Sequence, residues 1–156
     1  MIVRLAQVLA CAFVLLACTP SPKSKPDAPG CGFHADEHAL VFWSSGSSFN
    51  TDLREFTAYG DGHVDVRGNV ANGTAHVTPA RIEQLQRDIA ATDVFDEDQG
   101  CYYDDDLPTD SEGSSLVAQN NGAQRKYSVA GDAPDAVTRA MDVSARFFDE
   151  VTPTAK

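Results

Sequence analysis

Two histidines near the start of the chain have a spacing that suits a metal ion. His34 and His38 are related as i and i+4, which would place both imidazoles on one face of a helix, where they could share a zinc ion. In the zinc-protease pattern a Glu directly follows the first His, but here Ala35 stands at that position. No third ligand is identifiable from the sequence. We therefore interpret residues 34–38 as a polar surface segment, with a metal site as the alternative.

An acidic stretch later in the chain is the second candidate metal site. Residues 88–124 contain ten acids and no Lys or Arg, and the acids concentrate at 96–98 and 104–106. Calcium takes about six to eight oxygen ligands, so Asp104 and Asp106 could contribute to a Ca²⁺ site. The pattern Asp96-x-Asp98-x-Gly100 in the same stretch is not an EF-hand loop, because Gly100 takes the place of a ligand and Leu107 stands where the closing Glu would be. We interpret the stretch as a solvated acidic loop and predict no cofactor, with Ca²⁺ as the alternative.

Aromatic side chains are the candidates for contact with a partner. Tyr102 and Tyr103 are flanked by acids in this predicted loop, and exposed loop tyrosines suit binding because they have an apolar ring and a polar hydroxyl. Trp43 lies in a short apolar run and is predicted to be part of the core. His63 and His76 are predicted to be surface residues. The sequence contains neither a nucleophile elbow nor a phosphate-binding glycine loop, so we assign no catalytic residue.

The N-terminal segment indicates where these residues act. An apolar run that ends at Ala17 has the layout of a secretory signal and is too short to span a bilayer. Residues 15–18 (Leu-Leu-Ala-Cys) resemble the lipobox of bacterial lipoproteins. The resemblance implies that residues 1–17 are a signal peptide and that Cys18 carries a diacylglyceryl group and further acyl chains such as palmitate, which together anchor stably. It also implies the outer membrane, facing the periplasm or the cell surface, because Thr19 rather than Asp follows. An ordinary cleaved signal peptide is the alternative.

A tether and one domain are predicted to follow the anchor. Residues 18–30 contain four prolines and no large apolar side chain, which predicts an extended tether. A single domain is predicted over residues 31–152. Lipidation of Cys18 leaves Cys31 and Cys101, and we expect these two to form a disulfide in an oxidising compartment. A redox-active pair is the alternative, although the Cys-x-x-Cys spacing is absent.

The charge of the chain excludes some partners. The formal net charge is −11, and removal of residues 1–17, which contain one base and no acid, lowers it to −12. Nucleic acid is therefore excluded as a partner, because phosphate binding needs a basic surface. Adhesion to anionic headgroups is excluded for the same reason, so the membrane would be contacted through the lipid on Cys18.

Hydrophobic periodicity and turn signals predict the elements that position these residues. The alternation of His63 to Arg67 and the hairpin signal of Asn121-Gly122 are the clearest strand indications. The predicted strands cover residues 40–43, 53–59, 63–67, 74–77, 114–120 and 123–129. Predicted helices cover residues 78–92, capped by Thr78-Pro79, and about 133–151, with a buried stripe of Val137, Met141 and Phe148. Together these elements predict a two-layer α+β fold, an antiparallel sheet of about five to six strands with two helices packed on one face.

The order of these signals carries a family resemblance over about residues 39–151. The motifs are Tyr59-Gly60-Asp61-Gly62, Thr78-Pro79 with Leu85, Val94-Phe95, Asp106-Leu107-Pro108-Thr109 and the Asn121-Gly122 hairpin. In this order they resemble an uncharacterised bacterial family, domain of unknown function 6438. The resemblance implies a secreted or lipid-anchored envelope protein, and it implies no activity and no catalytic residue.

These observations favour a non-enzymatic, lipid-anchored module of the cell envelope. We expect it to bind an envelope protein, a peptide or another envelope ligand through its loops. One alternative is a metal-dependent envelope hydrolase that uses His34 and His38. A second alternative is a structural component of an envelope assembly.

Overall fold

The computed structural model describes residues 35–47, 52–69, 72–104 and 112–154. The strands are β1 (Val41–Ser47), β2 (Arg54–Ala58), β3 (His63–Gly68), β4 (Gly73–His76), β5 (Gly100–Tyr103), β6 (Glu112–Asn120) and β7 (Ala123–Ala130). The helices are α1 (Pro79–Ala90) and α2 (Asp135–Val151), with short 3₁₀ helices η1 (Val94–Asp96) and η2 (Thr152–Thr154).

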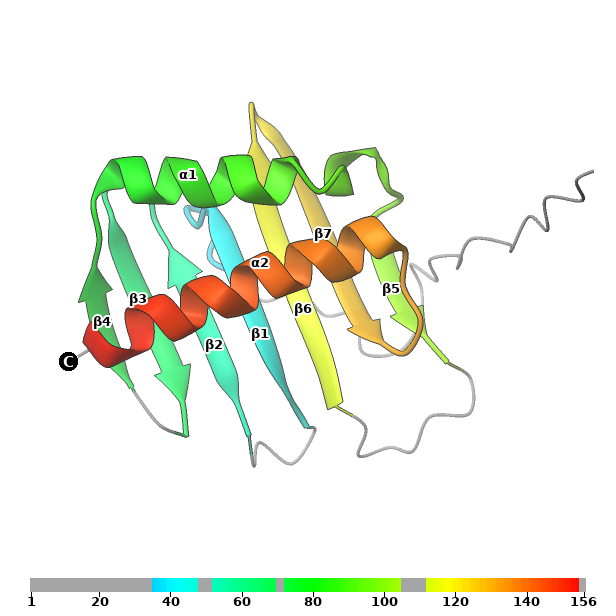
Figure 1. Ribbon diagram of the computed structural model, residues 1–156, viewed down its shortest axis with the longest axis horizontal. Helices are drawn as coiled ribbons and strands as arrows, with labels where there is room; N and C mark the ends of the chain where they lie inside the picture. Colours follow the sequence, from blue (N-terminus) through cyan, green and yellow to red (C-terminus); the bar gives the residue numbers. More distant parts are fainter. Residues whose placement is uncertain (1–34, 48–51, 70–71, 105–111, 155–156) are drawn as a thin grey trace, which may run out of the picture.

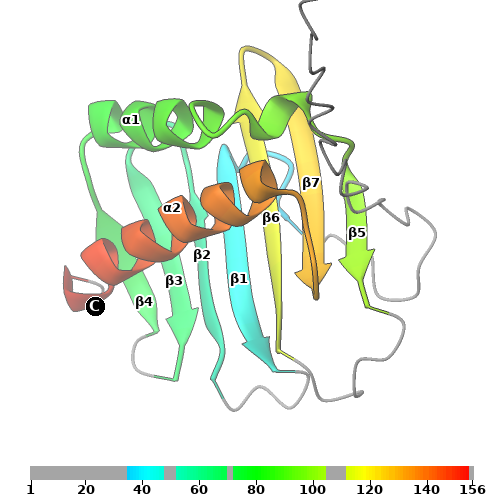
Figure 2. The same cartoon turned by 45° about the vertical axis from the view of Figure 1, so that its right-hand side comes forward.

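The seven strands form one sheet, in the order β4-β3-β2-β1-β6-β7-β5. Both helices cross the same face of this sheet (Figure 1). The turned view in Figure 2 shows the helices as one layer in front of the sheet, and no helix of the described chain lies on the opposite face. The predicted two-layer α+β architecture, with two helices on one face, is confirmed.

The sheet differs from the prediction in size and in direction. It has seven strands rather than five to six, and β5 pairs in parallel with β7, with Gly100 opposite Tyr127 and Tyr103 opposite Ala130. All other neighbouring strands are antiparallel. β5 was predicted to be part of a solvated acidic loop, and that prediction is wrong. Its four residues are too few to show an alternating pattern, and the acids on both sides dominate the local composition.

Local signals placed the helices correctly. α1 begins at Pro79, where the Thr78 side chain accepts a hydrogen bond of 3.3 Å from the Arg81 backbone amide. Such a cap satisfies a donor that would otherwise have no partner in the helix. The predicted stripe of α2 is buried. Within the described ranges, neither helix has the length and apolar character needed to cross a membrane.

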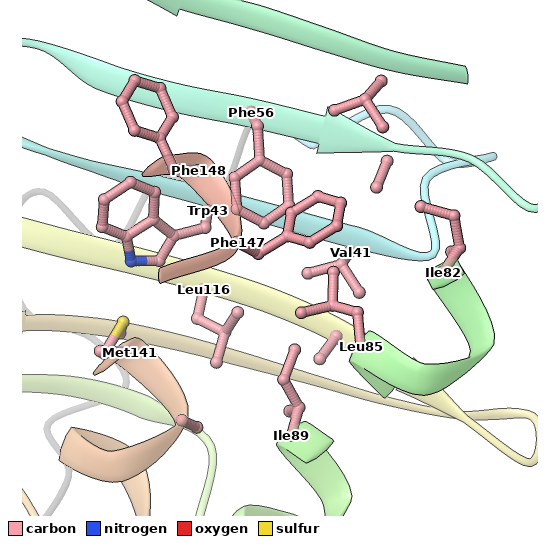
Figure 3. Packing of buried hydrophobic residues seen from close by; sticks show 14 of the residues in the cluster. Val41, Trp43, Phe56, Ile82, Leu85, Ile89, Leu116, Met141, Phe147 and Phe148 are labelled. Carbon is pink, nitrogen blue, oxygen red and sulfur yellow. The ribbon is translucent and has the colours of Figure 1, made fainter. Parts of the chain in front are cut away.

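The core between the sheet and the helices is rich in aromatic side chains (Figure 3). The Phe56 ring lies 5.0 Å from that of Phe147, and the Trp43 ring lies 5.8 Å from that of Phe148, between centroids. The prediction that Trp43 belongs to the core is confirmed, since the residue is almost fully buried. These rings fix the face of the sheet that meets the helices. Because side chains alternate along a strand, the intervening residues of β1, β2 and β3 project from the opposite face.

Two glycine-containing turns set the register of the strands. The turn between β2 and β3 contains Gly62, whose φ of +91° suits glycine. The turn between β6 and β7 contains Asn121 at φ 48° and Gly122 at φ 79°. Two successive positive φ angles are the requirement of a type I′ hairpin turn, so the hairpin predicted from Asn121-Gly122 is confirmed.

Candidate binding site on the helix-free face of the sheet

A hollow of about 650 Å³ lies on the helix-free face of the sheet, over β1 to β4. We call it the sheet hollow. The strand side chains that line it are Phe42, Glu55, Thr57, Asp65, Arg67 and Thr74, and Asp36, Tyr59 and Asn72 complete its polar wall. Most of these groups are polar, in contrast to the apolar opposite face.

Strand register brings the lining residues together. Glu55 and Thr57 flank the buried Phe56 on β2, so both side chains leave the core face. In the pairing of β2 with β3, Glu55 lies opposite Arg67 and Thr57 lies opposite Asp65. Residues paired in this way have side chains on the same face and within reach of one another. The hollow therefore combines carboxylate, guanidinium and hydroxyl groups on two adjacent strands.

Glu55 is the least well paired carboxylate of the sheet hollow. Its side chain is only 22% exposed, and its Oε1 lies 3.8 Å from the Nη1 of Arg67, whose side chain is 74% exposed. Within the described parts of the chain, its carboxylate accepts no hydrogen bond. Burial raises the pKa of Glu55, and the positive charge of Arg67 offsets part of that rise. A partly buried carboxylate without a close donor can accept hydrogen bonds from a ligand.

Asp65 is held by neighbouring side chains. Its Oδ1 lies 2.9 Å from the Nε2 of His63, and it accepts a hydrogen bond of 3.3 Å from the hydroxyl of Thr74.

The rings of His63 and His76 meet edge to face, with centroids 5.5 Å apart. His63 is half-buried and His76 is exposed, so the expectation that both are surface residues holds fully only for His76.

Tyr59 extends the wall of the sheet hollow toward Asp36. The Tyr59 hydroxyl donates a hydrogen bond of 3.3 Å to Asp36 Oδ2. Burial is the largest cause of a raised Tyr59 pKa, and the negative charges of Asp36 and Asp65 raise it further. A raised pKa keeps this phenol protonated, so it remains a hydrogen-bond donor.

Two of the four residues predicted as possible metal ligands, His38 and Asp104, lie in the described part of the chain. His38 is 81% exposed along its side chain, and its Nε2 lies 3.5 Å from Glu37 Oε1. Asp104 is exposed and follows β5, while His34 and Asp106 lie outside the described residues. In the described part of the chain, no group of three or more His, Cys, Asp or Glu side chains could hold a metal ion.

The two tyrosines predicted to contact a partner have different environments. Tyr102 is 2% exposed, and its hydroxyl donates a hydrogen bond of 2.5 Å to the Asp98 carbonyl oxygen. The prediction that Tyr102 belongs to a binding surface is therefore wrong, because β5 turns this side chain into the core. Tyr103 is half-buried, and its hydroxyl lies 3.2 Å from Ser128 Oγ.

Cys101 is buried and takes part in a disulfide. Cys31, its predicted partner, lies outside the described residues, as do the signal peptide (1–17), Cys18 and the tether (18–30). The pairing with Cys31 and the lipid anchor remain predictions.

A second, smaller groove of about 320 Å³ lies beside the end of α2. Arg54, which lines it, lies over the rings of Trp43 and Phe148, with its guanidinium carbon 5.5 Å and 4.9 Å from their centroids. The same guanidinium forms an ion pair of 2.5 Å with Asp149. The cation of this groove is thus already paired with one of its two carboxylates, which makes the groove the weaker candidate for polar recognition.

No protein-family model matches this chain, and no curated protein matches it at a significant level. The resemblance to domain of unknown function 6438 therefore remains a prediction.

One signal in the sequence points to the polar surface on which the sheet hollow lies. The alternation from His63 to Arg67 places His63, Asp65 and Arg67 on one strand face, opposite Val64 and Val66. Polar residues on every second position indicate a solvent-facing sheet surface. The partners of this face on β2 could not be identified without the register.

Proposed function

We propose that this chain is a lipid-anchored module of the cell envelope that binds a small polar ligand in the sheet hollow. The single observation that carries the binding role is the hollow itself, in which Glu55, loosely paired with Arg67, stands among donors and acceptors from adjacent strands. Its volume of about 650 Å³ is within the range of about 300–1,000 Å³ that is common for ligand sites. The binding surface proposed here is thus a sheet face rather than the loops.

The anchor in this proposal is supported by the sequence. A short apolar run followed by Leu-Leu-Ala-Cys at residues 15–18 suits a lipoprotein signal, and the proline-rich residues 18–30 suit a tether. A lipid on Cys18 would hold the domain near the membrane while the sheet hollow remains accessible. No observation favours the hydrolase or the structural alternative over this role.

Filling the sheet hollow tests the binding role. Thr57 is a half-buried hollow residue, and Trp at this position suits a strand. Saturation-transfer NMR with saccharides, short peptides, amines and carboxylates would be run on the wild type and on Thr57→Trp. We expect Thr57→Trp to lose the ligands that the wild type binds, while Thr138→Trp on the exposed face of α2 retains them. Equal binding by both variants would show that ligands go elsewhere.

Intact mass and fractionation test the anchor separately. We expect native protein to carry an acyl-glycerol mass on Cys18 and to float with membranes, and we expect Cys18→Ser to be soluble. A native protein that is soluble and unmodified would contradict the anchor and leave the binding role untouched.

A further inference from the structure

We propose that the sheet hollow recognises an uncharged saccharide of about one or two sugar units. The inference rests on the proposed function and names the chemical class of its ligand. It follows from three features of the same hollow, namely its mixture of donors and acceptors, its aromatic walls and the sign of its charge.

The polar groups of the hollow match a ligand that both donates and accepts hydrogen bonds. Glu55 offers carboxylate oxygens that accept no hydrogen bond within the described chain, so they can accept from hydroxyl groups. Hydrogen bonds from hydroxyls to a carboxylate are short and about twice as strong as neutral ones. Arg67 and Asn72 supply N–H donors, and the hydroxyl of Thr57 can act in either role. A polyhydroxylated ring presents both kinds of group at close spacing.

Two aromatic residues border these polar groups. Phe42 is half-buried on β1 and lines the hollow from the sheet, while Tyr59 lines it from the turn that follows β2. The face of an aromatic ring is electron-rich, so it attracts the polarised C–H groups of a sugar ring. Aromatic rings beside hydrogen-bonding groups thus suit the two kinds of surface that a pyranose has.

The charge of the hollow excludes acidic ligands. Asp36, Glu55 and Asp65 line it with one guanidinium, that of Arg67. Like charges across a binding surface disfavour the wrong partner strongly. The chain as a whole has a formal net charge of −11, which adds to this repulsion. Uronic acids, sialic acids and phosphorylated sugars are therefore rejected.

The lining carboxylates alone would also attract a cation, so the test must separate a sugar from an organic amine. The aromatic walls suit either ligand, since an ammonium group is also attracted to a ring face. The donors Arg67 and Asn72 favour the sugar, because an ammonium group accepts no hydrogen bond. Arg67 would also repel it.

Calorimetric titration of the purified protein provides this test. The neutral probes are maltose, cellobiose and N,N′-diacetylchitobiose, with glucuronic acid as the acidic probe and spermidine as the cationic probe. The variant is Glu55→Gln, and the matched control is Glu83→Gln, which removes the same charge from the exposed side of α1. We expect at least one neutral disaccharide to bind, and Glu55→Gln to weaken it by about five- to tenfold through loss of a charge-assisted hydrogen bond. Glu83→Gln should bind like the wild type, and glucuronic acid should not bind.

The outcomes separate this inference from the proposed function. One outcome is that no neutral disaccharide binds, while spermidine or a peptide binds the wild type but not Thr57→Trp. This result would overturn the saccharide inference and support the hollow as a binding site. Equal weakening by Glu55→Gln and Glu83→Gln would show a general charge effect and overturn the role of Glu55. Saccharide binding that persists in Thr57→Trp would overturn both.

Discussion

Replacement of Glu55 by Gln should make the protein more stable at neutral pH. The Glu55 side chain is 22% exposed, and its ion pair with Arg67 has a separation of 3.8 Å and an exposed partner. Such a pair is worth about 0–0.5 kcal/mol. Burial of the charge costs more than this, because an unpaired carboxylate is far costlier to remove from water than the neutral amide of Gln, for which the cost is about 1–3 kcal/mol when burial is complete. For partial burial we expect a net gain of about 0.5–1 kcal/mol in the free energy of unfolding.

The pH dependence of this gain has a defined sign. Because burial raises the pKa of Glu55 above its ordinary value of 4.5, the folded state binds the proton more readily than the unfolded state. The destabilisation by Glu55 is therefore complete above the raised pKa and disappears as the pH falls through 4.5. The stability advantage of Glu55→Gln over the wild type should be largest near pH 7 and should vanish near pH 4.

Urea unfolding followed by circular dichroism at several pH values measures this difference. Glu83→Gln, on the exposed face of α1, is the control for a simple change in net charge. A decrease of more than about 1 kcal/mol in the free energy of unfolding of Glu55→Gln at pH 7 would refute the claim that the Glu55 charge destabilises the fold. A decrease of that size is expected when a charge that stabilises the fold is removed. Glu55 would then serve the fold rather than a ligand.

Three further predictions concern the scaffold. Tyr127→Phe should lower the free energy of unfolding by about 1–3 kcal/mol in urea titration. The reason is that the buried Tyr127 hydroxyl donates to two backbone carbonyls near η1, at 2.6 Å and 3.3 Å. An unchanged free energy of unfolding would contradict this. Glu150→Gln should cost about 0.5–1 kcal/mol at pH 7 by removing a bidentate pair with Arg81. Because Arg81 lowers the pKa of Glu150, this contribution is present above pH 4.5 and should be lost at lower pH, so a pH-independent difference would refute it. Gly62→Ala should unfold at a clearly lower temperature than Gly122→Ala. Both positions have positive φ, but only a methyl group added at position 62 would meet a backbone oxygen, at 2.1 Å. Equal melting temperatures would argue against this.

The elements set by local signals could be predicted from the sequence. The start of α1 follows from a capping threonine before proline, and the β6–β7 turn follows from Asn121-Gly122, because each signal acts over a few residues. β5 could not be predicted, since it is stabilised by parallel pairing with residues 127–130, which come later in the chain. The same cause explains the error at Tyr102, whose burial depends on that pairing.

The candidate site required the register of the sheet. The sequence showed polar residues on one face of β3, but Glu55 became part of the same hollow only through the pairing of β2 with β3. Sequence reasoning instead singled out residues with ligand-like types, such as His38, whose side chain is exposed. Residue type indicates possible chemistry, whereas the strand pairing determines which groups meet.

Mapping of a bound ligand by ¹H–¹⁵N NMR tests the central proposal most directly. The labelled protein would be titrated with the strongest ligand found by the saturation-transfer screen. We predict that the shifted backbone amides cluster on the strands under the sheet hollow, at Glu55, Thr57, Asp65 and Thr74, and that Thr57→Trp abolishes the shifts. Shifts centred on the groove beside the end of α2, or spread evenly over the molecule, would contradict the account.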